Sequence, residues 1–554
     1  MERRTFLRFK PKAEEKTPPI FQLAKTTTNE AGLEPYDGPW GISQVTHLLR
    51  RTMFGAKWED IQFFSEMNPL EAVNYLLTSP TETPPQPVND YNGSNDFIDP
   101  DVPLGESWID APRNNDAEGH RIWTLKCWWY GNILDQDRSI LEKMTLFWHN
   151  HIPVEFYGVF FGRWNYRYLE TMRTHALGNF RSLARAATLD HAMLHYLNGQ
   201  YNGAGAPDEN YARELQELFC IGKGPEANYT EGDVQAVARI LTGWRVNYDT
   251  DEVQFFPWAH DVEDKQFSEF YGNRLIQGRS EGAGAAELDE MLDMIFENPE
   301  CALFLCRKLY RFFVHHEIDP LTEELVIIPL AEILRTNNYE IAPVLQTLFS
   351  SQHFFDQSRK GALLKSPADF LTSLYREFDT PIPPRELLKD RRQHNGHLVW
   401  NSSVINQNLG DPPNVAGWPA YYQIPAFDKA WVTTNSLPQR ARFTNWILWS
   451  GISTENFLSK LRILDIVAQI PDAANPNKLI NNVLEWMYSI EVADQFKAKL
   501  KSILLSGQVS DHYWTDAWLL YLNNPDNEMQ RNVVRNRLLN FFYTLLHQPE
   551  YHLC

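Results

Sequence analysis

Several features that define common protein classes are scarce or absent in this chain of 554 residues. No apolar run approaches the roughly 18 to 20 residues that a membrane-spanning helix needs, so the composition predicts a globular protein without a membrane span. The cysteines are too few and too scattered for a disulfide framework, and no Cys-x-x-Cys pair offers a metal-binding knuckle. They are Cys127, Cys220, Cys301, Cys306 and Cys554.

Positive charge is also scarce. The 51 lysines and arginines face 71 aspartates and glutamates, which gives a formal net charge of -20. Because phosphate binding requires clustered positive charge, nucleic acid is excluded as a partner, and an acidic polymer would be repelled as well. The sequence has no Ser-x-x-Lys or Gly-x-x-x-x-Gly-Lys motif, which argues against serine–lysine hydrolases and against nucleotide hydrolases with a phosphate-binding loop.

Aromatic residues, in contrast, are abundant. The chain has 18 tryptophans, more than is usual for its length. Aromatic faces suit either a large core or the flat apolar sides of sugars, and we favour the core.

The spacing of apolar residues predicts an all-α fold, because helical periodicity recurs along the chain and no convincing strand-like alternation is present. We expect one large multi-helix domain with long irregular loops, followed by a helical C-terminal region packed on it. The loops are predicted where Pro, Asn, Asp and Gly are frequent. The expected parts are a polar, basic arm at 1–36, the main domain at 37–438 with loops at 79–114, 243–285 and 381–438, and the C-terminal region at 439–554.

The arm carries a possible export signal. "RRTFLRF", from Arg3 to Phe9, is typical of a twin-arginine motif, but the polar "KPKAEEKTPP" follows where an apolar segment should stand. Two interpretations therefore remain open: a chance pair of arginines on a cytoplasmic protein, or a degenerate signal that exports the protein together with a partner.

Six motifs in a fixed order resemble a large bacterial family known as domain of unknown function 1800. They are "FWHNHIPV", "RTHALGNFRSL", "PDENYARELQELFCIG", "YTEGDVQAVARILTGW", "HDVEDKQF" and "PPNVAGW". The resemblance runs from about Pro39 to the terminal "LLHQPEYHL" and implies a mostly helical, commonly exported protein. It also implies that a neighbouring gene often encodes a protein similar to alkaline-phosphatase-type hydrolases. The resemblance does not indicate which reaction this chain itself would carry out. The chain departs from the family pattern at Cys220, where threonine is more usual, and in lacking the apolar export segment.

One of these motifs contains several acids around a single arginine. Helical geometry in "PDENYARELQELFCIGKG", residues 207–224, places Glu214 at the edge of an apolar face and Glu217 farther round. Arg213 and Glu217 have the spacing of a helical ion pair. The acids are either a solvated helix surface or a general acid and base beside a cleft, with Asn210 and Arg213 facing a ligand.

Histidines supply the second group of candidates. His149 and His151 in "WHNH" come just before Pro153, where a helix should end, and could bind zinc or iron with a carboxylate from elsewhere. They could equally satisfy the free carbonyls of that helix end. In "HDVEDKQF", His260 and Asp261 with Lys265 either form part of a site or cap a short helix.

The leading hypothesis is an enzyme that hydrolyses an extracellular polymer or its fragments by acid–base or metal-assisted chemistry. Two hypotheses from other classes compete with it: a non-catalytic scaffold that binds a hydrolase-like partner protein, and a glycan-binding module. We expect the loops at 79–114 and 243–285 to border one concavity near His260. The proposed roles are catalytic for Glu214, Glu217 and Asp261, binding for Trp148, Asn210, Arg213 and Lys265, and divalent transition metal ligation for His149, His151 and His260.

Overall fold

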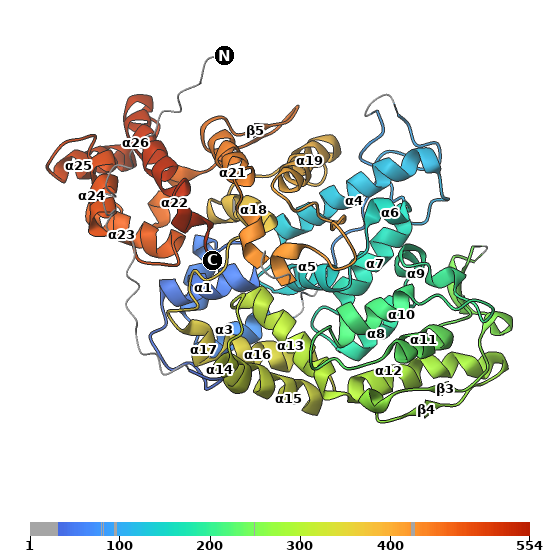
Figure 1. The fold of residues 1–554 in the computed structure, drawn as a ribbon. Helices are drawn as coiled ribbons and strands as arrows, with labels where there is room; N and C mark the ends of the chain where they lie inside the picture. Colours follow the sequence, from blue (N-terminus) through green and yellow to red (C-terminus); the bar gives the residue numbers. More distant parts are fainter. Residues whose placement is uncertain (1–30, 79, 81, 94–96, 249, 423–426) are drawn as a thin grey trace, which may run out of the picture.

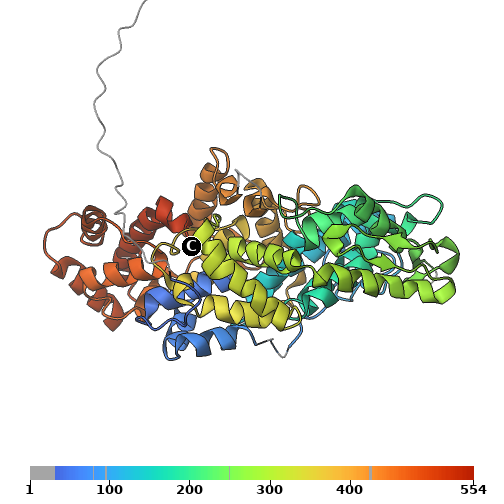
Figure 2. The ribbon, with the colours of Figure 1, turned by 60° about the horizontal axis from the view of Figure 1, so that its bottom comes forward.

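The computed structural model describes residues 31–554 except 79, 81, 94–96, 249 and 423–426. It is 58% helical and 5% strand, so the expected all-α class is confirmed. The molecule is elongated, with helices of the C-terminal region at one end and the segment around residues 200–300 at the other (Figures 1 and 2). No helix among the described residues is both long and apolar enough to span a membrane. Arg3 to Phe9 lie outside the described residues.

Helices follow one another along the whole described chain. The first part contains α1 (Ile42–Thr52), α2 (Trp58–Ser65), α3 (Pro69–Leu76), α4 (Asn115–Asp135), α5 (Leu141–His151), α6 (Phe156–Val159), α7 (Gly162–Thr174), α8 (Phe180–Thr188) and α9 (His191–Tyr196). The middle part contains α10 (Asn210–Glu214), the π-helix η2 (Leu215–Cys220), α11 (Glu231–Ile240), α12 (Glu287–Glu297), α13 (Pro299–Phe313), α14 (Pro320–Thr322), the π-helix η6 (Glu323–Ile327), α15 (Ile328–Thr336), α16 (Ile341–Phe349), α17 (Gln352–Phe355), α18 (Pro367–Glu377) and α19 (Leu388–Val404). The last part contains α20 (Pro419–Tyr422), α21 (Ser436–Asn445), the π-helix η8 (Trp446–Ser450), α22 (Ile463–Gln469), α23 (Pro476–Met487), α24 (Asp494–Leu504), α25 (His512–Asn523) and α26 (Glu528–Leu546).

Strands are limited to short antiparallel hairpins in the part of the chain that the structure describes. They are β1 (Trp244–Asn247) with β2 (Glu252–Phe255), β3 (Lys265–Gln266) with β4 (Leu275–Ile276), and β5 (Ile452–Ser453) with β6 (Leu458–Ser459). The first two lie in the predicted loop at 243–285. Short 3-10 turns connect other elements: η1 (Gly199–Tyr201), η3 (Pro257–Ala259), η4 (Glu269–Tyr271), η5 (Glu281–Ala286), η7 (Phe427–Trp431) and η9 (Pro549–His552).

The prediction of an irregular segment at 381–438 is wrong for much of its length, because it contains the 17-residue helix α19. This helix lacks a continuous apolar stripe. It packs along α4 through contacts such as Gly396 against the ring of Trp123. Ion pairs from Arg385 and Arg391 to Asp135, each 2.7 Å long, hold this segment against the end of α4. Apolar periodicity alone therefore could not indicate it.

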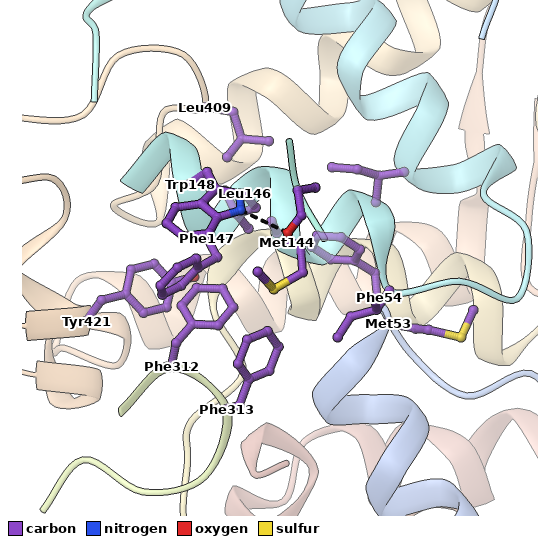
Figure 3. Close-up of a cluster of buried hydrophobic side chains, with 14 of the residues drawn as sticks. Met53, Phe54, Met144, Leu146, Phe147, Trp148, Phe312, Phe313, Leu409 and Tyr421 are labelled. Atoms are coloured by element: carbon purple, nitrogen blue, oxygen red, sulfur yellow. Dashed lines mark hydrogen bonds between the residues drawn. The ribbon is translucent and has the colours of Figure 1, made fainter. Parts of the chain in front are cut away.

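A fully buried helix lies near the middle of the molecule. Every residue of α5 from Glu142 to His151 is buried, and its apolar side chains lie in the cluster that Figure 3 shows, together with Met53 and Phe54, which follow α1, and with Phe312 and Phe313 of α13. The same helix carries buried polar groups, which must find partners inside the protein. Glu142 pairs with Arg173, and Lys143 pairs with Asp369.

The last residues of the chain pack against the segment that precedes α18. Residue Cys554 donates its backbone N–H to the carbonyl of Leu363, and Leu553 forms an isolated β-bridge with Leu364. Helix α23 packs on α1, where the indole of Trp486 donates to the carbonyl of Ala56. The terminal region is thus joined to the first helix and to the segment before α18.

Gly417, in "PPNVAGW", is predicted to be indispensable for stability. Its φ of 78° lies in the left-handed region, and an added Cβ would overlap the backbone oxygen of Asn150. We therefore expect Gly417→Ala to lower the free energy of unfolding by about 2 to 4 kcal/mol. Gly224→Ala is the control, since a Cβ there meets no atom within 4 Å. Urea unfolding of both variants tests this, and an equal effect of the two would contradict it.

Candidate functional site

The two histidines at the end of α5 point to different sides of the helix. Because the helix continues through His151, residues two positions apart are separated by about 200° around its axis. Nδ1 of His149 lies 3.1 Å from the hydroxyl of Tyr168, whereas Nε2 of His151 lies 2.8 Å from the carbonyl oxygen of Phe219. Burial lowers the pKa of each imidazole to about 3, so both are neutral.

The structure does not gather the predicted metal ligands. His260 lies in a third environment, against Thr242 and Glu287 rather than either histidine of α5. Among the described residues, no three His, Cys, Asp or Glu side chains come together as a metal site would require. The expectation that both histidines of α5 turn to one ion is wrong, because both belong to the helix and their side chains face different partners, Tyr168 and Phe219.

Trp148, predicted to bind a ligand, belongs to the core. Its side chain is fully buried, its indole N–H donates to the carbonyl of Ala176 at 3.0 Å, and its ring stacks on Phe180 (Figure 3 shows its apolar neighbours). It therefore has no surface to offer to a ligand. Ten of the 18 tryptophans are buried, in agreement with our preference for a core role.

The acidic motif forms two kinds of helix. A short α-helix, α10, begins at the exposed Asn210 and passes directly into the π-helix η2, in which each turn holds more residues than an α-helical turn. Arg213 does not bind Glu217, as its spacing had predicted. It bonds to Glu209 at 3.1 Å and to Glu231 at 3.0 Å.

Glu214 is the half-buried carboxylate that the sequence predicted. Among the described residues it has neither an ion pair nor a hydrogen bond, and its pKa is raised, chiefly by burial and then by the negative charge of Glu217. Glu217 pairs with Lys223 at 2.9 Å. A carboxyl group with a raised pKa near a second carboxylate can transfer protons, which is the chemistry that the acid–base hypothesis requires.

The motif "HDVEDKQF" forms a compact network of charges. Lys265 Nζ lies 2.7 Å from Glu287, whose other carboxylate oxygen lies 3.2 Å from Nε2 of His260. Asp261 accepts two hydrogen bonds from Arg239, at 2.7 and 2.9 Å. Burial alone would raise the pKa of Glu287, but hydrogen bonds from His260 and Lys265 outweigh it and lower the pKa. The network joins α11, β3 and α12.

A cavity lies elsewhere, beneath the first part of the predicted loop at 79–114. Its volume is about 200 Å³, below the 300–1,000 Å³ usual for drug-sized ligands, so it suits a single residue or end group of a larger molecule. The loop, α4 and the start of α19 line it. The apolar part of its lining includes Pro85, Pro87, Val88, Trp128 and Leu388, and the polar part includes Asp90, Thr124, Arg391, Arg392 and Asn395.

The cavity is lined by one carboxyl group with a raised pKa, that of Asp90. Its carboxylate accepts a 2.6 Å hydrogen bond from the hydroxyl of Thr124 and lies 3.3 Å from Nε of Arg392. Burial raises the pKa of Asp90 to about 6, although Thr124 and Arg392 both act to lower it. A carboxyl group that titrates near neutral pH inside a pocket is a recognised indication of a functional site.

Sequence reasoning missed these residues. Asp90 and Thr124 are 34 positions apart, and Arg392 lies nearly 270 positions farther along the chain, so no local spacing unites them. The only signal was the long loop itself, whose composition suggested that it lines a site.

The two long loops do approach one another, but not around His260. The guanidinium of Arg163 donates to the carbonyl of Ala111 in the first loop at 2.7 Å and to Asp251 in the second loop at 2.8 Å. The cavity beneath the first loop is completed by α4 and the start of α19 instead of by the second loop. The expected common concavity near His260 is therefore not the cavity that contains Asp90.

The network around Glu287 should contribute strongly to stability. Glu287→Gln removes the negative charge between Lys265 and His260, and breaking a buried ion pair costs about 3 to 5 kcal/mol. The exposed Glu269 provides the control, because Glu269→Gln should change the free energy of unfolding by less than about 0.5 kcal/mol. Denaturant unfolding measures both, and a stable Glu287→Gln variant would show that the network is not structural.

Asp90 should make stability fall as pH rises. A carboxyl group with a folded pKa of about 6 and an ordinary value of 3.8 binds protons better in the folded state, so the free energy of unfolding falls by about 2 kcal/mol between pH 4 and pH 7. Asp90→Asn removes this dependence.

The free energy of unfolding of the Asp90→Asn variant, relative to that of the wild type, should therefore be higher at pH 7.5 than at pH 4. The control is Asp110→Asn, which changes an exposed carboxylate of the same loop. If the difference between Asp90→Asn and wild type is the same at both pH values, the pKa of Asp90 is not raised.

Comparison with known proteins supplies a family. No curated protein and no solved structure matches the chain. A family model described as a protein of unknown function (DUF1800) matches residues 47–553, which is nearly the whole chain and includes the acidic helix, the charge network and the cavity. The six ordered motifs and this match agree, and the chain belongs to the DUF1800 family.

Proposed function

We propose that the protein is a hydrolase in which Asp90 transfers the proton. The observation that carries the proposal is the cavity of about 200 Å³ that holds a carboxyl group with a pKa of about 6. At neutral pH Asp90 is mostly ionised and can accept a proton from an attacking water molecule, then return it to the leaving group. The nearby Arg392 offers positive charge for the oxygen that becomes negative during the reaction.

The lining of the cavity supports a substrate with an apolar face and a polar edge. The partly buried Trp128 is fixed by a 2.7 Å hydrogen bond from its indole to the carbonyl of Pro85. The volume accommodates one unit of a polymer or a small fragment. That the polymer is extracellular follows only from the export that the family resemblance implies.

The acidic helix is the second location for the same chemistry. Glu214 also has a raised pKa and lies near Glu217, but it is supported by its pKa and half-burial alone, whereas Asp90 also lines a cavity. The scaffold hypothesis is favoured by a different observation, the occupation of His260, Asp261 and Lys265 by internal partners. In the scaffold hypothesis those residues only stabilise the fold, and a hydrolase-like partner protein carries out the reaction.

Activity on model substrates separates these proposals. The full chain is incubated with p-nitrophenyl glycosides, p-nitrophenyl esters and peptide p-nitroanilides across pH 4 to 9. We expect cleavage in one class, with a rate that rises as Asp90 ionises near pH 6, and a loss of about 100-fold or more in Asp90→Asn. Asp110→Asn, the control, should retain full activity.

A loss of activity in Glu214→Gln with full activity in Asp90→Asn would move the reaction to the acidic helix. If the wild-type protein cleaves none of the three classes, the hydrolase proposal fails and the scaffold remains.

A further inference from the structure

Three aromatic side chains remain exposed around the glycine-rich loop that precedes the acidic helix. Tyr201 is 67% exposed, Tyr248 is 62% exposed and Trp258 is 74% exposed. A single exposed aromatic side chain is normal on a protein surface, but three of them gathered on one short stretch indicate a contact with a partner. We call this set the aromatic surface.

Tyr248 of the aromatic surface is held in place by residues beneath it. The hydroxyl of Tyr248 donates a 2.8 Å hydrogen bond to Oε1 of the buried Gln200, the neighbour of Tyr201 in η1. The ring of Tyr248 also lies 5.9 Å from the ring of Trp164 in α7. Ordered aromatic rings lose little conformational freedom on binding, which suits a recognition surface.

Trp258 is fixed in the same way. The guanidinium of Arg245, in β1, lies 4.8 Å from the centre of its ring. Arg245 has no carboxylate within ion-pair distance among the described residues, and an added Cβ on Gly203 would lie 3.3 Å from its Nη2. The arginine thus lies between Trp258 and the glycine-rich loop, with N–H donors left for a ligand.

The loop between the two halves of this surface has almost no side chains. Gly203, Ala204, Gly205 and Ala206 follow Tyr201, and an added Cβ on Gly205 would meet no atom within 4 Å. Ala204 is pinned by a 2.9 Å hydrogen bond from its N–H to the carbonyl of Ala259, next to Trp258. A low, fixed loop between aromatic rings leaves open space in which a flat molecule can lie.

We propose that the aromatic surface binds a neutral polysaccharide. The apolar faces of sugar rings stack on aromatic rings, while the tyrosine hydroxyls, the indole N–H and Arg245 can bond to sugar hydroxyl groups. The formal net charge of -20 opposes a nucleic acid or a polyuronate, the other polymers that such rings could hold. The inference does not depend on hydrolysis at Asp90.

Retention of the intact protein on polysaccharides tests this inference. The probes are cellulose, chitin, xylan and mannan, with alginate and single-stranded DNA as anionic comparisons. We expect retention on at least one neutral polysaccharide and on neither anionic polymer. Trp258→Ala should weaken that retention about tenfold, because one stacked ring is lost.

Two further variants make the result specific. Gly205→Gln keeps every aromatic ring but fills the open space, so it should weaken retention as well. Trp400, on α19, is 64% exposed and far along the chain from this surface, so Trp400→Ala should bind like the wild type. Asp90→Asn should also bind normally, which separates this inference from the proposed hydrolysis.

The inference is overturned by any of three results. They are no retention on the four neutral polysaccharides, equal retention of wild type and Trp258→Ala, or preference for alginate or DNA. Melting temperatures of all variants verify that a weakened retention reflects the surface and not unfolding.

Discussion

The burial of α5 is the constraint on which the rest of the structure depends. A helix with no exposed residue between Glu142 and His151 contributes a large apolar area to the core, but each polar group on it must be satisfied internally. The partners come from widely separated segments. Arg173 lies in α7, Asp369 in α18 and the carbonyl of Phe219 in η2. Packing this one helix therefore fixes the positions of several others.

This constraint gives the residues of several sequence motifs contacts inside the fold. Asn150, in "FWHNHIPV", accepts the backbone N–H of Trp418 from "PPNVAGW" at 2.8 Å, so two motifs meet at the end of α5. His151 joins the same helix to the acidic motif. The features that support function lie outside this arrangement, in the cavity beneath the loop and on the exposed aromatic surface.

The sequence predicted what local periodicity determines. The all-α class, the helix that ends near His151 and the half-burial of Glu214 all follow from spacing along a helix. Contacts between residues that are far apart in the sequence could not be predicted in this way. Helix α19 is held against α4 largely by polar contacts, so its sequence lacks the apolar stripe, and Asp90 meets Arg392 only after folding.

The π-helix η2 was not predicted, because its residues keep an ordinary amphipathic pattern. Its presence limits which sequence changes the protein can accept. Substitutions in Leu215–Cys220 alter one side chain each, whereas removal of one residue would restore the α-helical turn. The part of the helix before the deletion would then rotate by about 100° relative to the part after it. The carbonyl of Phe219 would also move away from His151. The length of this segment is therefore a stricter requirement than the identity of most of its residues.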